Sequence, residues 1–327
     1  MARGRAGARA GRRPSRVSVR IGTCSWADDS LSKLWYPRGV GSAEARLRYY
    51  ADHFDTVEVN SSYYALPDER MASAWAERTP PGFVFHVKAF AMMTRHPVRA
   101  EQLPPDLRSE VAFDDRGRVD HPSREIRAEV FRRFSAAVDP LRQAGKMGGV
   151  LMQLPPYITY GERALEYLEW AREQLPGDEF LVEFRHRSWL TDEHREDVLR
   201  FLEALPATYV MVDAPRMDAN NVAPTVIGAT SSSAYLRLHG RNAATWNKRG
   251  GSASERFDHL YNEDELSEWV EPLRELAERH ESVWAMFNNN GRSVDVATGA
   301  EIAQAPTNAL QLRDMLEDAG VPVAAAR

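Results

Sequence analysis

The chain has 327 residues, 43% of them hydrophobic and 27% charged, which is enough apolar material for the core of one large α/β barrel or of two ordinary domains. Its formal net charge is −5, but residues 1–16 contribute six arginines and no acid, so the remaining residues carry −11. An acidic body argues against extended contact with nucleic acid, except through the basic tail.

Residues 1–16 are predicted to be a disordered, Arg-rich tail. They lack the apolar segment of a signal peptide. We interpret them as a solvated extension, with a polyanion-binding arm as the functional alternative. The chain has no run of 18 apolar residues that would predict a membrane span, and its single cysteine, Cys24, excludes a disulfide framework. A soluble cytoplasmic protein without a membrane partner is therefore expected.

From residue 17 onward the sequence alternates two kinds of segment. Short runs rich in Val, Phe and Tyr predict strands, and segments with helical spacing of apolar residues lie between them. The predicted strands are 17–26, 55–60, 83–88, 149–155, 180–185, 208–213, 234–240 and 283–289. The predicted helices are 43–53, 69–78, 126–144, 162–175, 192–204, 263–280 and 308–319. Residues 214–233 show little helical spacing.

This alternation indicates parallel strands with helical crossovers, because parallel neighbours need a long return connection. Eight repeats predict an α/β fold, a (β/α)8 TIM-like barrel in one domain over residues 17–320, followed by a C-terminal tail at 321–327. A doubly wound open sheet is the alternative, but no GxGxxG motif follows the first strand. Two long polar connections, 97–122 and 240–262, are candidates to cover a site.

The run VEFRHRSW (182–189) shows how the strands end. Side chains alternate across a strand, so Val182 and Phe184 share an apolar face, and Glu183 and Arg185 share the opposite face. Seven strands end with such a polar face, which we expect to point into the barrel near its C-terminal mouth. The residues are Glu58, Asn60, His86, Lys88, Gln153, Glu183, Arg185, Asp213, Arg237, His239 and Asn288.

Charges inside a barrel persist only when they pair with each other, bind a ligand or stay wet. The C-terminal mouth is where the active sites of TIM barrels lie, so the pattern predicts a site there. A purely structural network, in which Glu183 pairs with Arg185 or Arg237, is the alternative.

The residue types favour acid/base chemistry on a small polar or anionic substrate, such as a sugar or sugar phosphate, by isomerisation or hydrolysis. Glu183 is the predicted acid or base, with Glu58 or Asp213 as its partner. The candidate proton shuttles are His96, His186 and His239. The candidate anion holders are Lys88, Arg185, Arg237 and Arg241. Asn60, Gln153 and Asn288 are expected to orient hydroxyls, and Tyr64 and Trp189 to stack on a ring; rim packing is the other explanation for the aromatic residues.

Two other functions are compatible with the same residues. A divalent metal, held by Glu58, Glu183, Asp213 and His239, would support a metal-dependent isomerase or phosphodiesterase. The neighbouring cations disfavour a metal, so no cofactor is predicted. A non-enzymatic module that binds nucleotide or nucleic acid through the tail and an aromatic rim is the third possibility. The sequence predicts no oligomeric state.

The order of the motifs resembles the YecE-like family, also called domain of unknown function 72, from Val19 to about Leu316. The markers are IGTCSW (21–26), VEVNSSYYALP (57–67), FVFHVK with Thr94-Arg95-His96 (83–96), GGVLMQLPP (148–156), VEFRHRSW (182–189), YLRLHGRN (235–242) and FNN (287–289) with Asn308-Ala309. Members look like TIM barrels and are sometimes described as related to sugar isomerases. The resemblance therefore implies a barrel and leaves the activity open.

This chain departs from the family's pattern at two places. Cys24-Ser25 stands where the family usually has Ser-Gly or a similar small pair. Residues 290–307 separate FNN from Asn308-Ala309, which in the family follow within about ten residues. The insertion leaves open whether Asn308 reaches the mouth.

Overall fold

Eight parallel strands form a closed barrel in the computed structural model, which describes residues 17–248 and 253–325. The strands are β1 (Val19–Thr23), β2 (Thr56–Val59), β3 (Val84–Lys88), β6 (Met147–Gln153), β7 (Phe180–Glu183), β8 (Thr208–Asp213), β9 (Ser233–Leu238) and β10 (Ser282–Phe287). Around the barrel they follow chain order, and β1 closes it between β2 and β10. The TIM-like barrel expected from the sequence is confirmed.

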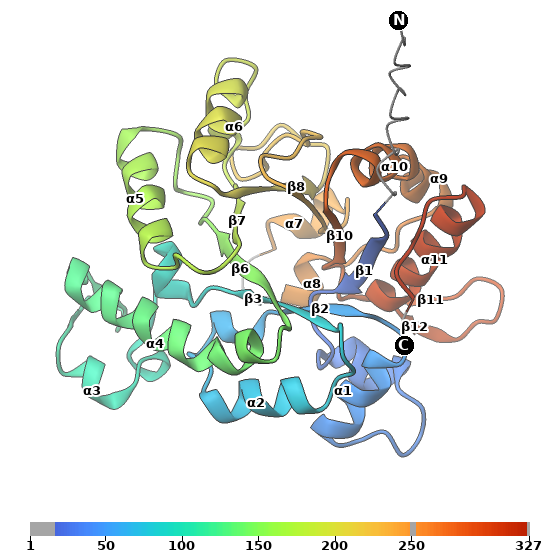
Figure 1. Ribbon diagram of the computed structural model, residues 1–327, viewed down its shortest axis with the longest axis horizontal. Helices are drawn as coiled ribbons and strands as arrows, with labels where there is room; N and C mark the ends of the chain where they lie inside the picture. Colours follow the sequence, from blue (N-terminus) through green and yellow to red (C-terminus); the bar gives the residue numbers. More distant parts are fainter. Residues whose placement is uncertain (1–16, 249–252, 326–327) are drawn as a thin grey trace, which may run out of the picture.

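Helices surround the strands (Figure 1). They are α1 (Ala43–Ala51), α2 (Glu69–Glu77), α4 (Arg124–Gln143), α5 (Glu162–Glu173), α6 (Arg195–Ala204), α9 (Glu263–Ser267), α10 (Val270–Arg279) and α11 (Gln304–Asp318). Ser42, Asp68 and Ser123 begin α1, α2 and α4 as N-caps, because each side chain accepts a hydrogen bond from the backbone two or three residues into the helix. The predicted helix over 263–280 is two helices, α9 and α10.

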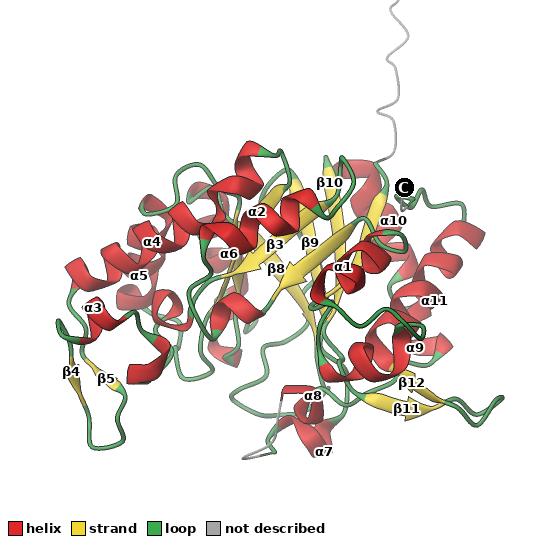
Figure 2. Ribbon diagram, turned by 90° about the horizontal axis from the view of Figure 1, so that it is seen from below, coloured by secondary structure: helices red, strands yellow, loops and turns green. Residues whose placement is uncertain are grey.

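The connections differ from the regular βα unit at three places. No helix forms over 214–233, between β8 and β9. Residues 97–122 form a short helix α3 (Pro105–Arg108) and a hairpin of β4 (Ala112–Phe113) and β5 (Val119–Asp120). The described part of 240–262 contains α7 (Ala243–Trp246) and α8 (Ala253–Arg256). Figure 2 shows α7, α8 and the β4–β5 hairpin on the lower side of the barrel.

The insertion at 290–307 also has a defined structure. It forms a second hairpin, β11 (Arg292–Val294) and β12 (Glu301–Ala303), and then enters α11. Asn308 is fully buried in α11, where its side chain accepts a hydrogen bond from the backbone of Tyr261 at 3.0 Å and donates one back at 2.9 Å. Asn308 therefore ties a loop to a helix and does not reach the barrel mouth.

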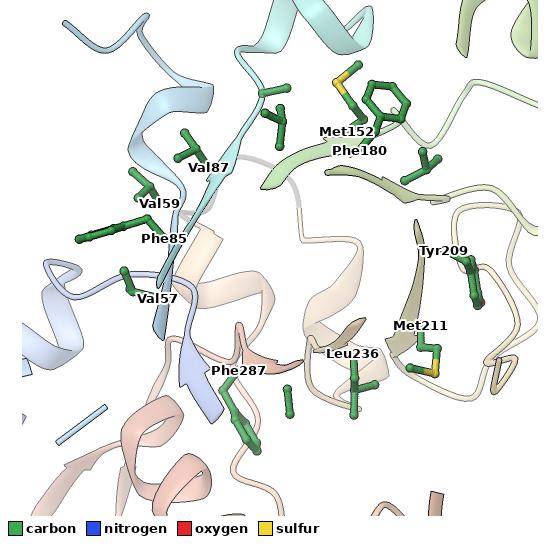
Figure 3. Packing of buried hydrophobic residues seen from close by; sticks show 14 of the residues in the cluster. Val57, Val59, Phe85, Val87, Met152, Phe180, Tyr209, Met211, Leu236 and Phe287 are labelled. Carbon is green, nitrogen blue, oxygen red and sulfur yellow. The ribbon is translucent and has the colours of Figure 1, made fainter. Parts of the chain in front are cut away.

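Apolar side chains fill two separate regions. Figure 3 shows Val57, Phe85, Met211 and Phe287 pointing away from the barrel axis, toward the helices. The smaller inner cluster lies within the barrel and contains Cys24, Leu151, Leu181, Val210, Val212, Tyr235, Trp284 and Met286. The outer cluster holds the helices on the barrel, and the inner cluster closes the barrel below its mouth.

His86 belongs to this closed interior. It is fully buried, with its ring 4.8 Å from that of Tyr235 and 4.5 Å from that of Trp284. Burial lowers its pKa to about 3, so it is neutral. Gly148 makes room for it, because a Cβ atom at Gly148 would lie 2.6 Å from the imidazole. His86 therefore packs the barrel and is not a proton shuttle at the mouth.

The end of the chain also packs against the barrel. Residues 321–325, predicted as a tail, continue from α11 to the start of β1. The backbone of Val19 donates to Pro322 at 2.8 Å, and Ala324 donates to Val19 at 2.9 Å. Residues 1–16 and 326–327 lie outside the described residues, so the prediction for the basic tail is not tested. No helix within 17–248 and 253–325 is long and apolar enough to cross a membrane.

Candidate functional site

A fully buried arginine joins two carboxylates at the centre of the barrel. Arg237 comes from β9, Glu58 from β2 and Glu183 from β7, and none of the three side chains is exposed. Arg237 donates Nε to Glu58 Oε2 at 2.9 Å and Nη2 to Glu58 Oε1 at 2.6 Å. Its Nη1 donates to Glu183 Oε2. This two-sided pairing offsets the cost of burying the guanidinium, which needs nearly all of its donors satisfied.

His239 lies beside this group and is held as a neutral imidazole. Asn288 donates its amide to His239 Nδ1 at 2.8 Å, so the ring proton is on Nε2, which contacts Glu183 Oε1 at 3.0 Å. The Asn288 oxygen in turn accepts from Asn60 at 3.3 Å. Burial lowers the pKa of His239 to about 3, and Glu183 only partly opposes this effect. We call Glu58, Glu183, Arg237 and His239 the floor cluster.

A pocket of about 560 Å³ opens above the floor cluster, at the C-terminal ends of the strands. Its wall is formed by residues at or just after the ends of β1, β2, β3, β6, β7 and β10, and by Arg256 and Phe257 from the connection 240–262. The polar and ionisable residues that line it are Cys24, Ser25, Asp28, Asp29, Asn60, Ser61, Tyr63, Tyr64, Lys88, His96, Gln153, Arg185, Arg256, Asn288 and Asn290. The sequence predicted Asn60, Tyr64, Lys88, His96, Gln153, Arg185 and Asn288 as site residues, and the structure brings these seven together.

Lys88 connects the pocket to the floor cluster. Its Nζ donates to Gln153 Oε1 at 2.9 Å, and Gln153 Nε2 donates to Glu183 Oε1 at 2.8 Å. Burial, with the positive charge of Arg237 adding to the effect, lowers the pKa of Lys88 to about 8. Burial alone would raise the pKa of Glu183, but Arg237 and His239 reverse this, so its pKa lies well below the ordinary value.

The floor carboxylates leave little negative charge for the pocket. Arg185 points into the pocket, and its nearest carboxylate oxygen, on Glu183, is 3.8 Å away and already bound by other donors. Arg185 rests instead on the ring of Trp246, 4.9 Å from its centroid. Lys88, Arg185 and Arg256 therefore present three cations to one cavity.

His96 lines the pocket next to Tyr63. Its Nδ1 lies 2.8 Å from the hydroxyl of Thr94, and its ring meets Tyr63 edge-on at 5.1 Å. Burial, with Lys88 and Arg185 adding to the effect, lowers the pKa of His96 to about 3. A bound anion would neutralise those two cations and so raise this pKa.

Asp213 and Arg241, both predicted for the site, lie elsewhere. On β8 the inner face carries Val210 and Val212, so Asp213 points to the outer side, and the prediction that Asp213 points into the barrel is wrong. There Arg241 donates to it at 2.9 Å and Trp269 donates at 3.1 Å. The alternation was misread because β8 is apolar on both faces.

His186 and Trp189 also lie outside the pocket. His186 caps the turn η5 (Arg187–Trp189), accepting from the backbone of Ser188. Trp189 is fully buried, stacks on Phe184 at 4.2 Å and donates to the backbone of Ile158 at 2.8 Å. His186 continues the outward face of β7, and Trp189 packs on Phe184 of the same face.

The four predicted metal ligands are not assembled either. Asp213 faces away from Glu58 and Glu183, whose oxygens are occupied by Arg237. A guanidinium between the carboxylates takes the place that a cation would need. In the described part of the chain, no three His, Cys, Asp or Glu side chains form a group suited to a metal.

Several lining residues were not predicted. Arg256 and Phe257 come from the connection 240–262, which was predicted to cover the site. None of the described lining residues comes from the other predicted connection, 97–122. Asn290 directly follows the motif FNN. Asp28 follows the first strand, and burial raises its pKa. Their loops carry no periodicity, so the sequence offered only proximity to a strand end as a signal.

Comparison with known proteins follows the same motifs. The model of a family described as protein of unknown function DUF72 matches residues 20–326. The UPF0759 protein YunF of Bacillus subtilis (strain 168) is 31% identical over 302 residues, covering 91% of this chain and 95% of that protein. The UPF0759 protein YecE of Escherichia coli (strain K12) is 28% identical over 170 residues, 52% of each chain.

Solved structures show the same fold. A DUF72 family protein of Thermotoga maritima MSB8 is 29% identical with a TM-score of 0.69, covering 92% of this chain and 99% of that one. One from Enterococcus faecalis V583 is 23% identical with a TM-score of 0.68, covering 92% and 98%. The barrel fold is therefore shared with these proteins.

Proposed function

Because the chain belongs to the DUF72 family, a family of unknown function, we propose its function from the site itself. We infer that it is an enzyme that binds a small anionic substrate, such as a sugar phosphate, at the barrel mouth. The reaction is acid/base isomerisation or hydrolysis, carried out by groups that face the pocket.

The observation that carries this proposal is the uneven charge of the pocket. Lys88, Arg185 and Arg256 face it, and the carboxylates near them have other partners. Arg237 binds Glu58 and Glu183, Asp28 accepts from Ser30 and Leu31, and Asp29 accepts from Lys33. Lys88 has no carboxylate partner among the described residues, and the only carboxylate near Arg185 is Glu183 at 3.8 Å, so both cations can bind a phosphate or carboxylate group. Amides of Asn60, Gln153 and Asn288 at the same level would hold hydroxyl groups.

The roles differ from those expected from the sequence. Glu183 is enclosed by Arg237, His239 and Gln153, so we assign it to fixing these side chains rather than to proton transfer. The proton carriers that a substrate can reach are Lys88 and His96. A bound anion raises the pKa of His96, which then supplies an acid next to the substrate.

Binding of phosphate compounds tests the proposal. We expect inorganic phosphate and sugar phosphates, but not the matching neutral sugars, to raise the melting temperature. Arg185→Gln should weaken binding about 10-fold to 100-fold, the usual effect of losing a charged hydrogen-bond donor. Arg241→Gln is the matched control, because Arg241 pairs with Asp213 outside the pocket.

Proton exchange tests the enzymatic part. Sugar phosphates that bind should exchange a carbon-bound proton with D₂O, detected by NMR, and His96→Gln should slow the exchange at least about 10-fold. Equal stabilisation by neutral and anionic sugars, or unchanged phosphate binding in Arg185→Gln, would refute the anionic substrate. Absence of exchange and of hydrolysis with every stabilising compound would leave a binding protein.

A further inference from the structure

We propose that Lys88 is a nucleophile that forms an imine with the carbonyl carbon of the substrate. The substrate class is then a small aldehyde or ketone that carries an anionic group. The anionic part of this inference rests on the proposed function, whereas the reactivity of Lys88 stands on its own surroundings.

The position of Lys88 suits attack on a bound carbonyl. It is the last residue of β3, it points into the barrel mouth, and it lines the pocket. Its Nζ lies 4.6 Å from the centre of the Tyr63 ring and is fixed by Gln153 Oε1 at 2.9 Å. Among the described residues no carboxylate pairs with it, so the amine is not held by an ion pair and lines the cavity.

Several charged and titratable groups surround this amine. From the other strands and loops they are Glu58, Tyr63, His96, Glu183, Arg185 and Arg237. Burial and Arg237 favour the neutral amine more than Glu183 and Glu58 oppose it, which gives Lys88 a pKa of about 8. Roughly a tenth of the amine is then unprotonated at pH 7, far more than for an exposed lysine. When neutral, the amine still donates a hydrogen bond to Gln153 Oε1, and its lone pair is available to a carbonyl carbon in the pocket.

The composition of the chain supports a role that only lysine can fill. The chain has 42 basic residues, and only four of them are lysines: Lys33, Lys88, Lys146 and Lys248. A fixed positive charge in the pocket is already supplied by Arg185 and Arg256. Arginine stays protonated in proteins, whereas lysine loses its proton and becomes a nucleophile.

The chemistry needs no further reagent. The Nζ lone pair forms the N–C bond while the carbonyl π electrons move to oxygen, which takes a proton from Nζ to give a carbinolamine. A proton is then added to the hydroxyl oxygen, the C–O bond breaks and water departs. The nitrogen lone pair forms the C=N bond of a protonated imine, which keeps the second Nζ proton. His96, on the same pocket wall, is placed to protonate the departing oxygen. The protonated imine would draw electrons from the adjacent carbon and acidify its proton, as isomerisation requires.

Reductive trapping tests the inference on the full chain. The protein is incubated with sodium cyanoborohydride and either dihydroxyacetone phosphate, glyoxylate or uncharged dihydroxyacetone, and labelled peptides are mapped by mass spectrometry. Lys88 should be labelled at least about 10-fold faster than Lys33 and Lys248, with a rate that rises through pH 8. Lys146 is a matched control, since it is buried away from the pocket and donates to three oxygens around Thr79.

Two results would overturn the inference. One is labelling of Lys88 by all three probes no faster than that of Lys33 and Lys248. The other is an equally fast adduct within the pocket in Lys88→Arg. The wild-type comparison needs no variant, so a folding defect in Lys88→Arg does not prevent a decision.

The same experiment separates this inference from the proposed function. Rapid labelling of Lys88 by the charged probes alone supports both. Equally rapid labelling by uncharged dihydroxyacetone supports the nucleophile and argues against an anionic substrate. Phosphate-dependent stabilisation without an adduct at Lys88 supports the anion site and rejects the imine.

Discussion

Replacement of Arg237 by methionine tests whether the floor cluster is a compensated group of charges. Methionine has a similar length and no charge, so Arg237→Met leaves Glu58 and Glu183 buried without their cation. Neither carboxylate has exposed side-chain surface. Arg237 makes five contacts, two with Glu58 and one each with Glu183, His239 and Cys24. Water therefore has no ready access to replace the guanidinium.

The expected cost follows from breaking a buried ion pair on one side. Removal of one partner destabilises a protein by about 3–5 kcal/mol, and here one cation serves two acids. The cost also depends on pH. In the wild type, the depressed pKa of Glu183 adds stability above its ordinary value of 4.5, and this stability is lost as the pH falls. In the variant, burial raises that pKa, so the destabilisation grows as the pH rises above 4.5.

Urea unfolding at pH 5 and pH 8 measures this effect. We expect Arg237→Met to lose about 3–5 kcal/mol at pH 8 and about 1–2 kcal/mol less at pH 5. Adding Glu58→Gln and Glu183→Gln should restore much of the loss. Arg216→Met, at a side chain 70% exposed, should change stability by less than about 0.5 kcal/mol. A loss below about 1 kcal/mol, or one that is the same at both pH values, would contradict the reasoning.

Three further substitutions test other parts of the structure. Asp213→Asn should leave phosphate binding unchanged within about 2-fold, measured by calorimetry, because Asp213 pairs with Arg241 outside the pocket. Asp55→Asn should raise the free energy of unfolding by about 1–3 kcal/mol at pH 7, measured by urea unfolding from pH 4 to 7. Burial raises the pKa of Asp55 from 3.8 to about 6, so the wild type loses stability as the pH rises through that range. Gly148→Ala should lower the melting temperature, with a loss of about 1–3 kcal/mol, because its Cβ would overlap the His86 ring; an unchanged melting temperature would mean that the ring moves freely.

The sequence predicted the strands well because each is a short apolar run that is followed by polar residues. The helices were equally readable where an apolar stripe and an N-cap such as Ser123 were present. The turn between α9 and α10 was missed, since the apolar spacing continues across it. The C-terminal pairing with Val19 was missed too, because an isolated bridge of two residues has no periodic pattern.

The site was predictable only where one face of a strand was clearly apolar. On β7 the alternation placed Glu183 and Arg185 correctly inside the barrel. On β8 the run TYVMVD is apolar at every position from Tyr209 to Val212, so alternation does not say which face is which. The depth of a residue was not readable either: Glu183 and Lys88 both follow the pattern, but only Lys88 lines the pocket.

Depth decides which of the buried charges can do chemistry. One guanidinium cannot neutralise two carboxylates, so the floor cluster retains about one negative charge while His239 stays neutral. Lys88 and Arg185 lie one layer above, and the two other carboxylates that line the pocket, Asp28 and Asp29, accept hydrogen bonds from Ser30 and Lys33. An anion that binds beside Lys88 and Arg185 offsets their charge and thereby favours the protonated forms of Lys88 and His96. Anion binding and proton uptake are therefore coupled. A calorimetric titration with phosphate near pH 8, in two buffers of different ionisation enthalpy, should show that protons are taken up. Binding of phosphate without proton uptake would contradict this electrostatic account.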